Sequence, residues 1–174
     1  MREPIYTVGH STLAADAFVT LLQGHAIRQL ADVRLIPKSG RYPHFAREAL
    51  AHLLASRGIT YRHFEDLGGR RKPRPDSVNT AWRVEAFRGY ADYMRTDPFR
   101  WASEGLLTFA EGHRTAIMCA EAVWWQCHRR LLSDSLMVGG IPVLHILSSA
   151  APKAHELSQF AREIEGEVVY PGLL

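Results

Sequence analysis

The sequence predicts an α/β fold: a single domain over residues 1–174, with a mainly parallel, open sheet of about five strands flanked by helices in a Rossmann-like, three-layer arrangement. Two observations predict this fold. Short β-branched apolar runs alternate with stretches of helical spacing over the first 61 residues, and strands that alternate with helices form parallel sheets. The length of 174 residues, with 47% hydrophobic and 22% charged residues, also fits one globular domain with a buried core.

Local patterns define the expected elements in order. Apolar runs indicate strands over residues 5–8, 27–34, 59–61, 115–119 and 142–147, with a short edge strand over 167–170. Apolar residues at helical spacing indicate helices over residues 14–23, 45–56, 82–95, 97–111, 125–138 and 153–164. Gly24 ends the first helix, Asp97-Pro98 begins the fourth, and Gly139-Gly140 ends the fifth. Residues 65–80, rich in Gly, Pro and Arg, form a long loop of the kind that is often functional.

Composition narrows the range of partners. No apolar run approaches the ~20 residues that a membrane span needs, and the chain opens without a signal peptide, so we expect a cytoplasmic protein with no membrane partner. The two cysteines cannot build a disulfide framework, and in a reducing compartment both are free thiols. The net charge is only +3, but one tight basic cluster favours an anionic partner. This cluster consists of Arg70, Arg71, Lys72 and Arg74.

Polar side chains follow three of the expected strands, at the edge where ligands bind in open parallel sheets. They are His10 and Ser11 after the first strand, Asp32 and Arg34 at the end of the second, and Cys119 and Glu121 after the fourth, followed by Cys127, His128 and Arg129 in the first turns of a helix. Three strand ends that deliver groups able to act on an anion predict one shared site, and this convergence carries more weight than any single residue.

We expect an enzyme that acts on a small anionic substrate containing a phosphate or a nucleotide. Cys119 is the candidate nucleophile, because the amino terminus of the following helix and Arg129 both favour a thiolate. Glu121 or His10 would transfer protons, Arg34 and Arg129 would hold the anion, and Asp32 would orient Arg34 or His10. Ser11, Cys127 and His128 complete the anion-binding set. No cofactor and no bound metal are predicted.

Other interpretations stay open. Each residue has a structural explanation: Asp32 can simply pair with Arg34, and Ser11 can cap a helix. A nucleic-acid-binding or nucleic-acid-processing module would use the basic cluster, Arg70, Arg71, Lys72 and Arg74, to contact phosphates. A thiol-redox or metal-binding protein would use Cys119, Cys127 and His128.

Several stretches together resemble one family. They are Thr7-Val8-Gly9-His10-Ser11-Thr12, Ala31-Asp32-Val33-Arg34 with Pro37, Leu67-Gly68-Gly69, residues 87–94, Met118-Cys119-Ala120-Glu121 with Cys127-His128-Arg129, and His145-Ile146. On these motifs the chain resembles the domain-of-unknown-function 488 family, which implies an α/β fold and leaves the reaction open. The sequence departs from the family pattern at Trp124, where the family usually has proline, a residue that would restrict this loop.

Overall fold

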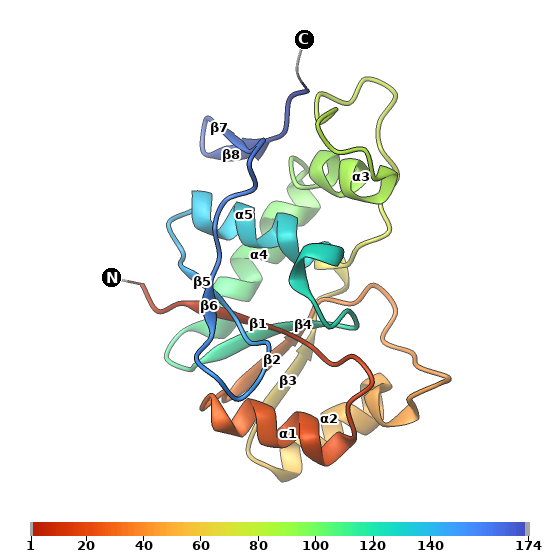
Figure 1. Cartoon of the computed structure of the whole chain (residues 1–174), viewed down its shortest axis with the longest axis vertical. Helices are drawn as coiled ribbons and strands as arrows, with labels where there is room; N and C mark the ends of the chain where they lie inside the picture. The colour runs from red at the N-terminus through yellow and green to blue at the C-terminus, as the bar shows by residue number, and fades with distance from the viewer. Residues whose placement is uncertain (1, 173–174) are drawn as a thin grey trace.

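A six-stranded sheet in the order β3-β2-β4-β1-β5-β6 forms the middle layer of the molecule (Figure 1). The computed structural model describes residues 2–172. Five strands are parallel, whereas the two-residue β6 runs antiparallel to β5. The strands are β1 (Ile5–Gly9), β2 (Gln29–Asp32), β3 (Thr60–His63), β4 (Thr115–Cys119), β5 (Val143–His145) and β6 (Lys153–Ala154). The predicted α/β class, with a mainly parallel sheet in a three-layer fold, is therefore confirmed.

Helices cover both faces of this sheet (Figure 1). One face packs against α1 (Ala15–Gly24) and α2 (Arg47–Ser56), and the other against α3 (Glu85–Tyr93), α4 (Asp97–Ala110) and α5 (Arg129–Val138). Side chains of a strand point alternately to the two faces, so Tyr6 and Val8 join the α1–α2 core while Ile5 faces the core beneath α3–α5. Among residues 2–172, none of the helices is long and apolar enough to cross a membrane.

The prediction of a helix over residues 153–164 is wrong. This segment forms β6, an irregular stretch, and β7 (Arg162–Ile164), which pairs with β8 (Glu167–Val169) in a separate two-stranded hairpin. The edge strand expected over 167–170 is therefore present, but it belongs to this hairpin. Buried polar contacts fix the segment in this non-helical conformation: His155 and the Ser158 N–H both donate to the carboxylate of Asp134.

Other predicted elements exist but are shorter than expected. The helix expected to begin near residue 125 begins at Arg129 and is preceded by a 3-10 turn, η3 (Trp124–Gln126). Cys127 has extended backbone angles, φ −137° and ψ 172°, so Cys127 and His128 precede the helix instead of lying in its first turns. Likewise, α2 follows a separate 3-10 turn, η1 (Pro43–Phe45), and α3 begins three residues later than expected, at Glu85.

The long loop between β3 and α3 is anchored on one aspartate. The loop groups Arg74 N–H, Ser77 Oγ and Asn79 Nδ2 all donate to the Asp92 carboxylate, at 2.8, 2.6 and 2.7 Å. Gly89 on the same helix allows the loop to pass, because a Cβ there would overlap the carbonyl oxygen of Arg71. The loop is thus held against α3 along much of its length.

Candidate functional site

A cleft of about 710 Å³ opens where β1, β2 and β4 end. Of the residues predicted from the sequence, those that line it are His10, Ser11, Arg34, Arg70, Cys119, Glu121, Cys127 and His128. Asp32 and Arg129 do not line the cleft but contact residues that do. Backbone hydrogen bonds join the strand ends: the His10 N–H donates to the carbonyl of Cys119, and the Val33 N–H to that of Met118.

The cleft divides into two groups of polar side chains that belong to opposite faces of the sheet. His10, Asp32 and Arg34 share the strand phase of Val8 and Leu30 and lie on the α1–α2 side, where His10 stacks on Phe45 at 4.2 Å between ring centroids. Cys119 shares the phase of Ile117 and lies on the α5 side with Cys127 and Arg129. Each group therefore has its own internal partners.

The two cysteines form the centre of the α5-side group. Their sulfur atoms lie 2.9 Å apart, and both side chains are nearly buried, with 3% and 7% of their surface exposed. Burial raises the pKa of Cys119 well above its ordinary value, as does its hydrogen bond to Cys127. Burial acts in the same direction on Cys127, but the hydrogen bond from Cys119 and the charge of Arg129 outweigh it and lower the pKa of Cys127 to about 6. Cys119 therefore keeps its proton and donates a hydrogen bond to the Cys127 thiolate.

Arg129, at the start of α5, donates two hydrogen bonds to this thiolate. Its main-chain N–H donates to Cys127 Sγ at 3.3 Å, and its Nε donates to the same atom at 3.2 Å. Nη2 donates to the carbonyl of Glu121 at 2.6 Å and Nη1 to Thr7 Oγ1 at 3.3 Å. With 1% of its surface exposed, Arg129 is a buried cation whose charge faces the sulfur. All these contacts of Arg129 are with groups of the protein itself. Arg129 is therefore not placed to bind an external anion, as the sequence had led us to expect, and other cations must do so.

The α1–α2-side group is an ion pair with a neutral histidine beside it. Arg34 Nε and Nη2 bind the two carboxylate oxygens of Asp32 at 2.9 and 2.7 Å, as a two-pronged pair. Tyr61 also donates its hydroxyl to Asp32. Arg34 Nη1 donates to His10 Nε2 at 3.4 Å, while His10 Nδ1 donates to the Ser11 carbonyl. Burial and the Arg34 charge lower the pKa of His10 to about 4, so its imidazole is neutral near pH 7.

His128 and Gly69, the latter from the Leu67-Gly68-Gly69 motif, also line the cleft. His128 Nε2 donates to the carbonyl of Val33 at 2.8 Å, and burial lowers the pKa of His128 to about 4. A Cβ added at Gly69 would lie 3.0 Å from His128 Nδ1, so a larger residue would require the His128 ring to move by a few tenths of an ångström. Within residues 2–172, no three or more His, Cys, Asp or Glu side chains are arranged to hold a metal ion.

The basic cluster of residues 70–74 is only partly directed to the cleft. Arg70 lines the cleft, with φ +60°. Arg71 lies over the ring of Tyr93 at 3.8 Å and donates to the carbonyl of Gly68, and Arg74 pairs with Asp76 on the surface. Lys72 is exposed and does not line the cleft. Nucleic-acid binding by Arg70, Arg71, Lys72 and Arg74 stays a prediction.

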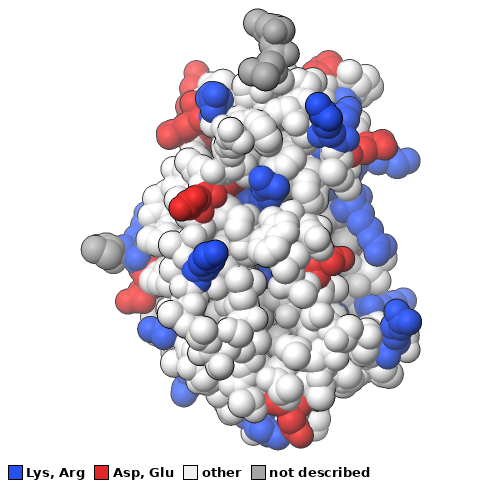
Figure 2. Space-filling model, viewed as in Figure 1, with Lys and Arg blue, Asp and Glu red and all other residues white. Residues whose placement is uncertain are grey.

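Two sets of residues had no role assigned to them from the sequence alone. Lys38 and Arg41, on the loop between β2 and α2, line the same cleft as Arg70. Figure 2 shows blue side chains along the margin of the molecule on which this loop projects in Figure 1. The second set is a buried chain of side chains behind Arg129, formed by Thr7, His145, His155 and Asp134. Two features of the sequence could have indicated this chain. Thr7 interrupts an otherwise apolar strand, and Asp134 lies within a helix whose neighbouring residues are mostly buried.

A comparison with family models matches residues 14–136, more than half of the chain, to the family described as "Domain of unknown function DUF488". The chain belongs to the DUF488 family. The matched range contains the Asp32–Arg34 and Cys119–Arg129 segments, whereas His10 and His145 lie outside it. Comparisons with curated proteins and with solved structures give no match. DUF488 membership therefore agrees with the observed α/β fold and names no reaction.

Proposed function

We propose that this DUF488 protein is a cysteine-dependent enzyme that acts on a small, phosphate-containing anion, with the Cys127 thiolate as the attacking group. The observation that carries the proposal is the environment of Cys127 Sγ at the wall of the cleft. Three donors face that sulfur: Cys119 Sγ at 2.9 Å, the Arg129 main-chain N–H at 3.3 Å and Arg129 Nε at 3.2 Å. Because the thiolate is the nucleophile in cysteine chemistry, this arrangement favours Cys127 for attack and Cys119 as its hydrogen-bond donor.

The charge of the cleft supports an anionic substrate. Arg34 and Arg129 are neutralised by Asp32 and by the Cys127 thiolate. Among residues 2–172, the remaining cations that line the cleft without an ion-pair partner are therefore Lys38, Arg41 and Arg70, opposed by Glu121. Three cations against one carboxylate leave a net positive rim that raises the local concentration of an anion. Lys38, Arg41 and Arg70 are all exposed, so a ligand reaches them without displacing an internal partner.

The expected chemistry is group transfer through a covalent intermediate. Cys127 Sγ forms a bond to the electrophilic atom of the substrate, and the leaving group departs with the electron pair of the bond that breaks. A proton from solvent neutralises the leaving group. Water then cleaves the intermediate and regenerates the Cys127 thiolate. His10, neutral near pH 7, can accept the proton of that water through Nε2 when Arg34 Nη1 turns from it toward the bound anion.

Alkylation by iodoacetamide, followed by intact-mass and peptide analysis, tests this proposal. We expect one fast site, Cys127, with a rate that is half-maximal near pH 6, and we expect Cys127→Ser to lose it while Cys119→Ser retains a fast site. Inorganic phosphate should slow this alkylation in a saturable way at constant ionic strength. Arg70→Gln should weaken that protection several-fold, whereas Arg74→Gln, a cation paired with Asp76 outside the cleft, should leave it unchanged.

Turnover of p-nitrophenyl phosphate completes the test. We expect release of p-nitrophenol that Cys127→Ser abolishes. Alkylation of both thiols only near an ordinary cysteine pKa of about 8.5 would contradict the thiolate assignment. Absence of turnover, or full turnover by Cys127→Ser, would contradict the proposed reaction.

Thiol redox chemistry is a second candidate, favoured by the 2.9 Å separation of the two sulfur atoms. Hydrogen peroxide as oxidant would be attacked by the Cys127 thiolate, which gives a sulfenic acid and hydroxide. The sulfur of Cys119 would then attack the sulfenic sulfur, forming a disulfide and releasing water. We expect peroxide to remove both titratable thiols and two hydrogens of mass, and Cys119→Ser to stop at the sulfenic acid. Two thiols that stay reduced after peroxide treatment would exclude this candidate.

A further inference from the structure

A continuous chain of buried hydrogen bonds runs from Arg129 to Asp134 and has no place in the chemistry described so far. Arg129 Nη1 lies 3.3 Å from Thr7 Oγ1, which lies 2.6 Å from His145 Nδ1. His145 Nε2 lies 2.8 Å from His155 Nδ1, and His155 Nε2 lies 2.7 Å from Asp134 Oδ1. Each of these side chains is at least 95% buried. Four separate segments contribute them: β1, β5, the stretch after β6, and α5.

With one proton on each imidazole, the two ends of this chain fix the direction of every hydrogen bond in it. Asp134 can only accept when ionised, and Arg129 can only donate. A neutral His155 therefore donates from Nε2 to Asp134 and accepts at Nδ1 from His145, which in turn accepts at its own Nδ1 from the hydroxyl of Thr7. That leaves a lone pair of Thr7 Oγ1 free to accept from Arg129 Nη1. This assignment gives every hydrogen an acceptor, and burial favours a neutral His145 by lowering its pKa to about 3.

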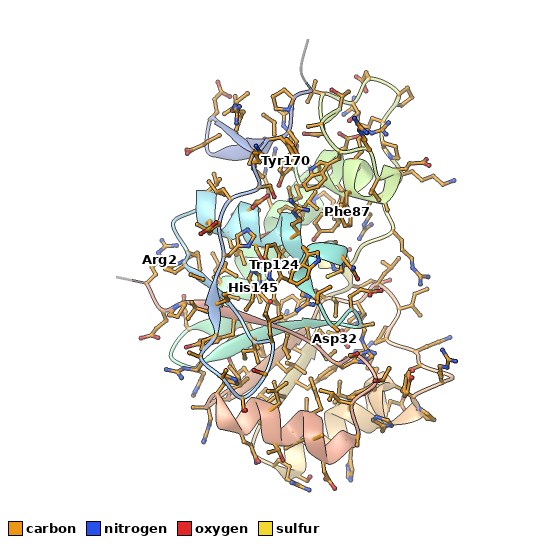
Figure 3. All side chains as sticks on the ribbon, viewed as in Figure 1. Arg2, Asp32, Phe87, Trp124, His145 and Tyr170 are labelled. Carbon is orange, nitrogen blue, oxygen red and sulfur yellow. The ribbon has the colours of Figure 1, made fainter. Side chains whose placement is uncertain are left out.

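Surrounding groups seal the chain from solvent. Trp124 stacks on His145 with ring centroids 4.3 Å apart and planes 6° from parallel, and it meets His155 edge-on (Figure 3). Tyr170 donates its hydroxyl to Asp134 Oδ2 at 2.8 Å, and the Ser158 N–H donates to Oδ1 at 3.1 Å. In a buried environment such hydrogen bonds are stronger than in water and hold their geometry. Trp124 thus covers the middle of the chain.

We infer that Thr7, His145, His155 and Asp134 form a positioning relay, which holds the Arg129 guanidinium against Cys127 Sγ and thereby sustains the Cys127 thiolate. The inference rests on the thiolate of the proposed function. The relay does not conduct protons to the sulfur, because Arg129 at its end stays protonated. It acts by orienting the hydroxyl of Thr7, which provides the acceptor for Arg129 Nη1, while Glu121 and Cys127 provide the acceptors for Nη2 and Nε. Without Thr7 Oγ1 the guanidinium loses the anchor opposite the thiolate.

The groups that face Cys127 are few, so its titration reports on Arg129. Cys119 faces it from β4 and Arg129 from α5, and the phenol of Tyr90 on α3 lies close enough to feel its charge. Tyr90 donates its hydroxyl to the carbonyl of Leu67 and stays neutral, because burial raises its pKa well above the ordinary value. Substitutions in the relay leave Cys119 and Tyr90 in place. A change in the Cys127 midpoint therefore measures the contribution of Arg129.

Thr7→Val tests the relay, with the pH dependence of Cys127 alkylation by iodoacetamide as the readout. Valine keeps the shape of threonine and removes the hydroxyl, so we expect the midpoint to rise by about one pH unit, equivalent to a roughly fivefold slower reaction at pH 6. Thr7→Ser keeps the hydroxyl and should keep the midpoint. His145→Leu, which does not touch Arg129, should raise the midpoint in the same direction because the hydroxyl of Thr7 loses its acceptor.

Thr115→Val is the matched control for a purely structural effect. Thr115 is also a buried strand threonine with a hydrogen-bonded hydroxyl, but it lies at the start of β4, far along the strand from Cys119. It should lower thermal stability without changing the midpoint. A Thr7→Val midpoint equal to that of the unaltered protein, while the latter stays near pH 6, would refute the relay alone. An unaltered protein with an ordinary midpoint near ~8.5 would refute the proposed function, and the relay with it.

Discussion

Gly9 determines how closely the end of β1 approaches the loop after β4. A Cβ at this position would overlap the carbonyl oxygen of Glu121, the same oxygen that accepts the hydrogen bond from Arg129 Nη2. One missing side chain therefore permits a contact that holds the cation beside the thiolate. The Gly9-His10 motif thus has a packing role in addition to the histidine's place in the cleft.

We expect Gly9→Ala to disturb both stability and the thiolate. Because the overlap is with backbone, the loop must move, which should lower the free energy of unfolding by about 1–3 kcal/mol. Displacement of the Glu121 carbonyl should also slow Cys127 alkylation at pH 6. Urea unfolding and the alkylation rate measure the two effects.

Gly24→Ala is the control, since a Cβ there would meet no atom within 4 Å and this glycine lies at the end of α1. That variant should be as stable as the unaltered protein or slightly more stable. Equal stability of Gly9→Ala and Gly24→Ala would contradict the close packing of β1 against Glu121.

At the scale of elements, hydrophobic periodicity was sufficient for the parallel sheet and for α1 to α5. It failed for residues 153–164, because Leu157, Phe160 and Ile164 have helical spacing yet remain largely exposed. The conformation there is set by His155 and Ser158 contacting Asp134, a partner more than 20 residues away in the sequence. Periodicity detects burial along one segment and cannot detect such distant polar anchors.

The same distinction separates the predicted and the missed parts of the site. His10, Arg34 and Cys119 could be placed at one edge because parallel strands end on the same side of a sheet. The relay could not be predicted, because the contact of Thr7 with His145 requires β5 to be the neighbour of β1, and strand order is not encoded in periodicity. The extended backbone at Cys127, which makes it the acceptor for Arg129, also depends on the 3-10 turn that precedes it.

Three histidines link the stability of the folded protein to pH. Burial lowers the pKa of His10 to about 4, of His128 to about 4 and of His145 to about 3, against an ordinary value of 6.5. Between pH 6.5 and about 4 the unfolded chain therefore binds protons that the folded protein does not. Stability must fall as the pH falls through this window, by up to about 1.4 kcal/mol per pH unit for each histidine.

We expect urea unfolding to show this loss between pH 6.5 and 4, with all three histidines contributing to its slope. His10→Asn should reduce the slope, because asparagine can keep the hydrogen bond to the Ser11 carbonyl but does not titrate. His52→Asn, at an exposed position on α2, should leave the slope unchanged. A protein that becomes more stable on acidification through this window would show that these imidazoles are charged when folded, and a charged His145 would have no acceptor at Nδ1 for the hydroxyl of Thr7.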